Sequence, residues 1–142
     1  MSGRATRGFL LALVGVVFAA PIDPLRAQDP ATETRSTLDG VYTAEQAERG
    51  RQSYMKACTE CHALAWAVGD VVRSWEGASL YGFFDVMTRT MPESNPGSLR
   101  RREYVDIIAY MLQVNGMPPG EQALSTGSSR LRQIIFRWSD TP

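Results

Sequence analysis

The sequence predicts a small all-α domain of about three to four helices, and two observations support this class. Apolar residues recur at steps of three and four in three stretches, over residues 43–57, 79–91 and 98–116, with helix-capping or helix-ending residues at their boundaries. No segment shows the convincing alternation of apolar and polar residues that half-buried strands require. The 142 residues, 44% hydrophobic and 21% charged, suit one globular domain with tails.

The first helix is predicted to begin at Thr43, with Gln46 three residues later completing a capping box. Its apolar stripe consists mostly of small residues: Ala44, Ala47, Gly50, Tyr54 and Ala57. A glycine in a helix interior costs about 1 kcal/mol relative to alanine. We therefore expect Gly50 to permit a close crossing with another helix, the alternative being an exposed glycine that the helix tolerates.

Two more helices follow a stretch, residues 62–77, that is ambiguous between short helical and irregular structure. Ser79 is expected to cap the second helix, whose buried face consists of Leu80, Phe83, Phe84 and Met87. A loop rich in turn residues over 91–97 ends it. Ser98 is expected to open the third helix, and Asn115-Gly116 to end it.

Both cysteines and the only histidine of the chain lie within five consecutive positions, Cys58-Thr-Glu-Cys61-His62. This C-x-x-C-H spacing is typical of covalent attachment of a c-type haem. On a helical turn, positions i and i+3 share a face, so Cys58 and Cys61 can meet the two vinyl groups along one porphyrin edge while His62 reaches the iron. The alternatives are weaker, since a redox C-x-x-C is expected near a βαβ pattern and a zinc site needs a fourth ligand.

The second axial ligand of such an iron is predicted to be Met91. The chain has no second histidine, and methionine is the usual alternative, in the range of potentials suited to electron carriers. Pro92 disfavours the α conformation at Met91, so its thioether can leave the helix. The other candidates are Met55, Met87, Met111 and Met117. Met55 is too close to the haem-binding turn, and Met111 lies in an apolar helical stripe; Met87 and Met117 remain the main alternatives.

The N-terminus predicts export. Arg4 and Arg7 precede a twelve-residue apolar run and a polar region, which is the order of a secretory signal. Cleavage is expected after Ala27, which gives a signal peptide over 1–27 and a periplasmic protein. Without cleavage, the run would tether the protein to the outer face of the inner membrane, although it is short for a membrane span.

The rest of the chain divides into three predicted regions. Residues 28–40 lack apolar periodicity and are predicted to be a flexible leader. Residues 41–116 form the predicted domain core, and residues 117–142 form a C-terminal extension that is expected to pack on it. The formal net charge is zero, from 15 basic and 15 acidic residues, so charge gives no case for nucleic-acid binding.

These motifs resemble class I cytochromes c, especially the monohaem type often associated with quinoprotein dehydrogenases. The resemblance covers about residues 41–135 and depends on AERGRQSYMKACTECH, LYGFFDVMTRTMPESNPGSL and EYVDIIAYMLQVNGMPPG. It implies a small cytochrome c fold wrapped around one covalently bound haem c, with iron ligated by His62 and Met91. It also implies that the face of Gly50 and Tyr54 packs across the last helix near Ala109 and Tyr110.

The resemblance extends to Trp75, which matches a tryptophan near a haem propionate; the alternative for Trp75 is a plain core indole. One feature departs from the family. The family usually has a proline after the histidine whose carbonyl accepts the imidazole N–H, and no proline lies between His62 and Pro92. Because this hydrogen bond fixes the orientation and basicity of the ring, the group that replaces it in this chain is an open question.

The resemblance implies a single-electron carrier and not an enzyme, serving alone or as the cytochrome subunit of a dehydrogenase or respiratory complex. Its expected partners are redox proteins such as a quinoprotein dehydrogenase, a terminal oxidase or another cytochrome. The alternative function is a haem-based ligand sensor or peroxidase-like enzyme with an open sixth coordination position. The run Arg100-Arg101-Arg102 is expected to be a solvated charged face, with docking to an acidic partner as the alternative.

Overall fold

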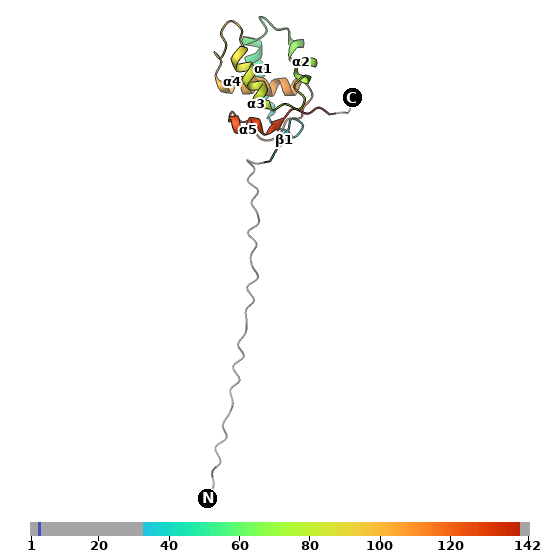
Figure 1. Ribbon diagram of the computed structural model, residues 1–142, viewed down its shortest axis with the longest axis vertical. Coiled ribbons are helices and arrows are strands. Elements are labelled where there is room, and N and C mark those ends of the chain that lie inside the picture. Colours follow the sequence, from blue (N-terminus) through green and yellow to red (C-terminus); the bar gives the residue numbers. More distant parts are fainter. Residues whose placement is uncertain (1–2, 4–32, 140–142) are drawn as a thin grey trace.

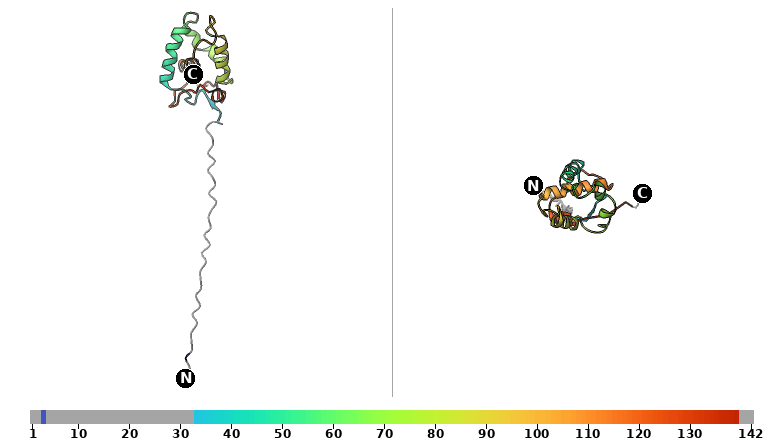
Figure 2. Two further views of the ribbon diagram at one scale, coloured as in Figure 1. Left: turned by 90° about the vertical axis from the view of Figure 1, so that its left-hand side faces the viewer. Right: turned by 90° about the horizontal axis from the view of Figure 1, so that it is seen from above.

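Two long helices, α1 (Ala44–Ala57) and α4 (Arg101–Val114), cross in close contact (Figure 1). The computed structural model describes Gly3 and residues 33–139. A third long helix, α3 (Leu80–Thr90), lies on the side of the domain opposite α1 (Figure 2). The predicted all-α class with three principal helices is therefore confirmed. Buried side chains from these three helices form most of the core, including Ala47, Tyr54, Leu80, Phe83, Phe84, Tyr104, Val105, Ile107, Ile108, Met111 and Leu112.

The crossing of α1 and α4 depends on Gly50, as the sequence predicted. A Cβ atom at this position would overlap the backbone carbonyl of Asp106 on α4, so only glycine allows the two backbones to approach this closely. One turn further along α1, the rings of Tyr54 and Tyr110 pack 5.5 Å apart. Gly50 thus lies against Asp106, somewhat earlier on α4 than the expected contact near Ala109.

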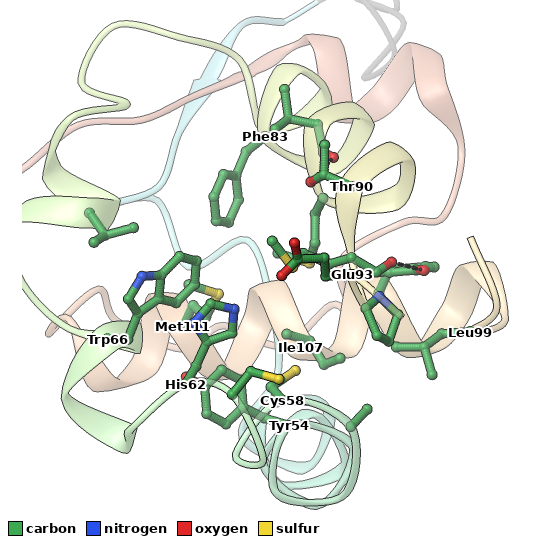
Figure 3. Close-up of a pocket in the computed structure, with 18 of the residues that line it drawn as sticks. Tyr54, Cys58, His62, Trp66, Phe83, Thr90, Glu93, Leu99, Ile107 and Met111 are labelled. Atoms are coloured by element: carbon green, nitrogen blue, oxygen red, sulfur yellow. Dashed lines mark hydrogen bonds between the residues drawn. The ribbon is translucent and has the colours of Figure 1, made fainter. Parts of the chain in front are cut away.

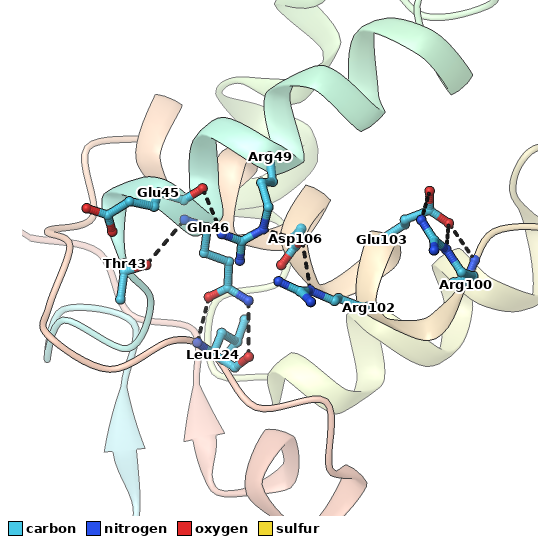
Figure 4. A network of polar contacts seen from close by, with 9 residues as sticks. All are labelled: Thr43, Glu45, Gln46, Arg49, Arg100, Arg102, Glu103, Asp106 and Leu124. Carbon is cyan, nitrogen blue, oxygen red and sulfur yellow. Dashed lines mark hydrogen bonds and ion pairs between the residues drawn. The ribbon is translucent and has the colours of Figure 1, made fainter.

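The start of α1 follows the prediction only in part. The Thr43 side chain caps the helix by accepting a hydrogen bond of 3.2 Å from the Gln46 backbone N–H. The Gln46 side chain, however, does not complete the capping box. It is buried and exchanges two hydrogen bonds with the backbone of Leu124, one donated at 3.1 Å and one accepted at 2.6 Å (Figure 4). Gln46 therefore ties the C-terminal segment to α1.

Helix α3 begins and ends where the sequence predicted. The Ser79 hydroxyl accepts a hydrogen bond from the Gly82 backbone N–H. Met91 follows the last helical residue and is extended, with φ −126° and ψ 150°, as expected for a residue before proline. The chain therefore leaves the helix at the predicted axial methionine.

Helix α4 begins later than predicted. Ser98 was expected to cap it, but the N-cap is Arg100. The Glu103 carboxylate accepts a hydrogen bond of 2.8 Å from the Arg100 backbone N–H, so this N–H at the start of the helix has a partner (Figure 4). At the other end, Asn115 and Gly116, with φ +81°, stop the helix as predicted.

The ambiguous segment between the first two long helices contains two short helices. These are a 3₁₀ helix, η1 (Leu64–Ala67), and a single turn of α-helix, α2 (Asp70–Arg73). Each has only four residues, which is too few for periodicity to reveal.

The two ends of the described chain meet in a short parallel sheet that the sequence did not predict. Strand β1 (Arg35–Ser36) pairs with β2 (Ile134–Ile135), and the last short helix, α5 (Ser128–Arg132), packs on α3. Two residues per strand are too few to show an alternation. Beside the sheet, the buried Thr37 hydroxyl donates a hydrogen bond to the Arg137 carbonyl and accepts one from its N–H.

Part of the predicted flexible leader therefore belongs to the folded domain, because residues 35–37 pair with the C-terminal segment. The C-terminal segment packs on the domain, with Leu131 and Phe136 fully buried. The predicted signal peptide over 1–27 lies outside the described residues, apart from Gly3. Within the part of the chain that the structure describes, no helix is long and apolar enough to cross a membrane.

Candidate functional site

A cavity of about 240 Å³ lies between the end of α1, the segment after it, α3, the loop that follows α3, and α4 (Figure 3). All five predicted site residues line it: Cys58, Cys61, His62, Trp75 and Met91. Most of the remaining wall is apolar and includes Val71, Phe83, Leu99 and Ile107. The fold thus brings residues 33 positions apart in sequence, from Cys58 to Met91, to one apolar space.

The C-x-x-C-H motif forms a turn directly after α1. Cys58 is the C-cap of the helix, and its N–H donates to the Tyr54 carbonyl at 2.8 Å. The N–H groups of Cys61 and His62 both donate to the Cys58 carbonyl, at 3.1 and 2.8 Å. Cys61 is exposed, whereas burial raises the pKa of the half-buried Cys58 thiol to about 11. The two thiols are free in the structure and do not form a disulfide with each other.

The His62 ring stacks on the indole of Trp66, with ring centres 4.2 Å apart and an angle of 27° between the planes (Figure 3). Both side chains are half-buried and line the cavity. Among residues 33–139, no group makes a hydrogen bond to either ring nitrogen of His62. The replacement for the family's proline carbonyl is therefore not a protein hydrogen bond within these residues.

The segment that carries Trp66 is attached to the end of α4 by Asn115. The Asn115 side-chain amide donates to the Ala67 carbonyl at 2.8 Å, and its oxygen accepts from the Gly69 N–H at 2.8 Å. The same amide also donates to the Met111 carbonyl at 2.6 Å. From the sequence, Asn115 was predicted only to end α4. Its two partners in this segment, Ala67 and Gly69, are more than 40 residues away, so no local pattern could reveal this role.

The backbone of Met91 is held by three hydrogen bonds. Its N–H donates to the Met87 carbonyl at 2.8 Å, and its carbonyl accepts from the Gly97 N–H at 3.3 Å. The third comes from the buried Tyr104 of α4, whose hydroxyl donates to the Met91 carbonyl at 2.6 Å. The sequence analysis did not predict this contact of Tyr104. The signal available was a tyrosine in a buried stripe, since a buried phenol usually requires a hydrogen-bond partner.

The other methionines differ in their relation to the cavity. Met87 and Met111 line it together with Met91. Met117 does not belong to the described lining; it is buried elsewhere, and its carbonyl accepts a hydrogen bond from Tyr42. Met55 is exposed and is also not part of the lining. By position, Met87 is the main competitor of Met91, while Met117 lies away from the other candidate ligands.

Trp75 lines the cavity and packs edge-on against Phe83, with ring centres 5.1 Å apart. This position is compatible with both roles expected for it, contact with a haem propionate or packing in the core. No arginine or lysine belongs to the described lining of the cavity, and its charged members are Glu60 and Glu93.

The donor set of the cavity fits a c-type haem. Two thiols one helical turn apart can form thioethers, and an imidazole and a thioether sulfur are the usual axial ligands of cytochromes c. The wall around them is mainly apolar, as a porphyrin requires. Cys58, Cys61, His62 and Met91 are therefore the residues that would hold the cofactor.

The three consecutive arginines at the start of α4 all have partners within the chain. Arg100 pairs with Glu103 at 3.2 Å, and Arg101 lies over the ring of Phe84. Arg102 lies 3.7 Å from the buried Asp106, which also pairs with Arg49 at 3.1 Å (Figure 4). The run stays largely exposed. Arg100 and Arg102 contact residues of α4, whereas Arg101 contacts Phe84 of α3 and Ser128 of α5.

Comparison with known proteins gave one family match. The sequence pattern of the family described as cytochrome c oxidase, cbb3-type, subunit III matches residues 45–111, just under half of the chain. No significant match was found among curated proteins or among solved structures. The matched region includes the C-x-x-C-H turn, Trp75, Met91 and most of α4. Together with the all-α fold, the match supports placing this region in the class I cytochrome c family, in which haem c and its iron are implied.

Proposed function

We propose that this protein is an exported monohaem c-type cytochrome that transfers single electrons between redox partners. A cytochrome c domain suggests a haem-based electron carrier and not an enzyme. One observation supports the proposed haem attachment and iron ligands: Cys58, Cys61, His62 and Met91 line the same apolar cavity. Any other use of this cavity would have to account for four haem-binding groups in one place.

Each residue has a distinct role in the proposal. Cys58 and Cys61 would hold the haem c covalently, and His62 and Met91 would bind its iron. When bound, the haem supplies an iron that cycles between Fe(II) and Fe(III). With His62 and Met91 both bound to the iron, no position would remain for a substrate, so the chain would carry electrons and would not transform a ligand.

The proposed partners are redox proteins of the respiratory chain. The matched family is described as a subunit of a cytochrome c oxidase, which favours a terminal oxidase as acceptor or as host complex. The similarity to cytochromes of quinoprotein dehydrogenases makes such a dehydrogenase a candidate donor. We place the protein in the periplasm because of its N-terminal signal, or on the outer face of the inner membrane where the signal is retained.

A visible and far-red absorption spectrum of the haem-loaded, oxidised protein tests the proposal. We expect a low-spin spectrum with the weak far-red band that is characteristic of charge transfer from methionine sulfur to Fe(III). Met91→Ala should abolish this band, whereas Met87→Ala, a matched control in the same cavity, should keep it. Loss of the band in Met87→Ala alone would assign the ligand to Met87. A high-spin wild-type protein without the band would contradict the carrier and favour the ligand-binding alternative.

A further inference from the structure

We propose that Trp66 is a positioning residue for the axial imidazole, and that ring stacking replaces the hydrogen bond that usually orients it. The inference rests on the proposed function, because it requires His62 to be an iron ligand. It assigns a role to a residue that neither the motif nor the family match identifies.

No hydrogen bond among residues 33–139 orients the His62 ring. The N–H of His62 is fixed to the Cys58 carbonyl, which sets the backbone. This leaves free the rotation of the ring about the bond that joins it to Cβ, a torsion with broad preferences. Among residues 33–139 no group makes a hydrogen bond to the ring nitrogens that would restrict this rotation. Packing against a neighbour is therefore what sets the plane of the ring.

The neighbour that packs against the ring is Trp66. The indole of Trp66 lies 4.2 Å from the imidazole, nearly parallel to it at 27°. Two flat rings in this arrangement resist rotation of either one, because turning the imidazole would drive its edge into the indole face. Stacking therefore selects one orientation of the imidazole plane.

Trp66 is itself held by the body of the domain. Its backbone N–H donates a hydrogen bond to the Ala63 carbonyl at 2.9 Å, at the start of η1. The next residue, Ala67, is fully buried, and Asn115 of the α4 terminus binds its carbonyl. The backbone that carries the indole is thus attached to the end of α4, so the indole can act as a fixed wall for the imidazole.

The consequence differs from that of a hydrogen bond. A carbonyl that accepts the imidazole N–H fixes the ring and also makes it a stronger donor to the metal. An indole face fixes the ring without accepting that proton. Trp66 therefore separates the two effects and supplies the orientation alone.

Proton NMR of the haem-loaded protein provides the test, because the four haem methyl shifts of a low-spin Fe(III) protein depend on the plane of the axial imidazole. We expect Trp66→Phe to preserve the order of these shifts and Trp66→Leu to change their order or narrow their spread. Leu64→Ala is the matched control. It lies on the same 3₁₀ turn but is half exposed and is not part of the described cavity lining, so it should leave the pattern unchanged.

A second measurement uses the wild-type protein, so that the test does not depend on a variant that folds. In the reduced, diamagnetic form, nuclear Overhauser effects should connect the indole protons of Trp66 with the ring protons of His62. Their absence would overturn the inference, as would a Trp66→Leu pattern identical to the wild type. Both results leave the proposed electron-carrier function standing if the far-red methionine band is present. A high-spin protein whose spectrum is insensitive to His62→Ala would overturn the carrier and the inference together.

Discussion

The two sides of the cavity hold their candidate ligands by different means. On one side, Met91 is fixed by three backbone hydrogen bonds, one of them from the buried Tyr104. On the other, the His62 ring is fixed by stacking on Trp66, in a segment attached through Asn115. Both arrangements end at α4, since Tyr104 lies near its start and Asn115 at its end. One helix therefore supports both proposed iron ligands, through hydrogen bonds toward Met91 and through ring packing toward His62.

The largest effect is expected at the contact between α1 and α4, because α4 supports both sides of the cavity. Gly50→Ala would place a methyl group on the Asp106 carbonyl and force α1 away from α4. We expect a loss of about 3 kcal/mol in the free energy of unfolding, measured by denaturant titration, with both sides of the cavity disturbed.

Gly82→Ala is the matched control for this substitution, because it lies in α3 and a Cβ there would make only an ordinary 3.6 Å contact with Trp75. It should be neutral or stabilising by up to about 1 kcal/mol. Equal destabilisation by the two substitutions would show that the crossing has no special requirement for glycine.

The next effect should appear on the methionine side alone. Tyr104→Phe removes the hydrogen bond to the Met91 carbonyl and should cost about 1.5 kcal/mol. The far-red methionine band should then disappear at a lower temperature than in the wild type, while the NMR signals of the His62 ring stay in place. Tyr110→Phe is the control, since the Tyr110 hydroxyl makes no hydrogen bond among the described residues. A methionine band of unchanged thermal stability in Tyr104→Phe would count against this support.

The converse substitution should affect the histidine side. Asn115→Asp keeps the acceptor for the Gly69 N–H but loses the donor to the Ala67 carbonyl, at a cost of about 1 kcal/mol. We expect shifted resonances of His62 and Trp66 with an unchanged methionine band. Gln113→Glu introduces the same charge change on the exposed face of α4 and should move neither signal. If Asn115→Asp weakened the methionine band as much as Tyr104→Phe, the two sides would not be independent.

The smallest effect should come from the cap of α4, which both sides share. The hydrogen bonds from the Arg100 side chain, and then from its backbone N–H, lower the pKa of Glu103 below 4.5. Its contribution is therefore complete above pH 4.5 and is lost as the pH falls through the lowered value. Because Glu103 is solvent-accessible, we expect Glu103→Gln to cost only about 0.5 kcal/mol at pH 7. The difference from the wild type should shrink in unfolding titrations at progressively more acidic pH, and a constant difference would contradict this account.

Features with local signals were predictable from the sequence. The caps at Thr43 and Ser79 and the extended Met91 each depend on residues within a few positions. The close approach at Gly50 was indicated by a glycine inside a helical stripe, although its partner Asp106 is distant in sequence. The residues of the candidate site were also named in advance, and the fold brings them to one cavity.

Features that depend on distant partners were not predictable. Gln46 was expected to cap its own helix, but Leu124, 78 residues away, offers it two buried hydrogen bonds. The strand pair joins residues about 100 positions apart, with two residues on each side. The contacts of Tyr104 with Met91 and of Asn115 with Ala67 and Gly69 were missed for the same reason. A single sequence carries the type of each residue, but the partner is decided only when the chain folds.

The length and direction of α1 have a practical consequence for attaching this protein to a surface. The helix has 14 residues and therefore extends about 21 Å, with Thr43 at its start and the cysteine turn directly after its end. Figure 2 shows that it begins at the end of the domain where β1 lies. A domain immobilised on an electrode through a tag placed before residue 33 should direct its exposed Cys61 away from the support. Electrons would then have to cross the length of this helix to reach the electrode, while partners in solution would meet the cavity end directly.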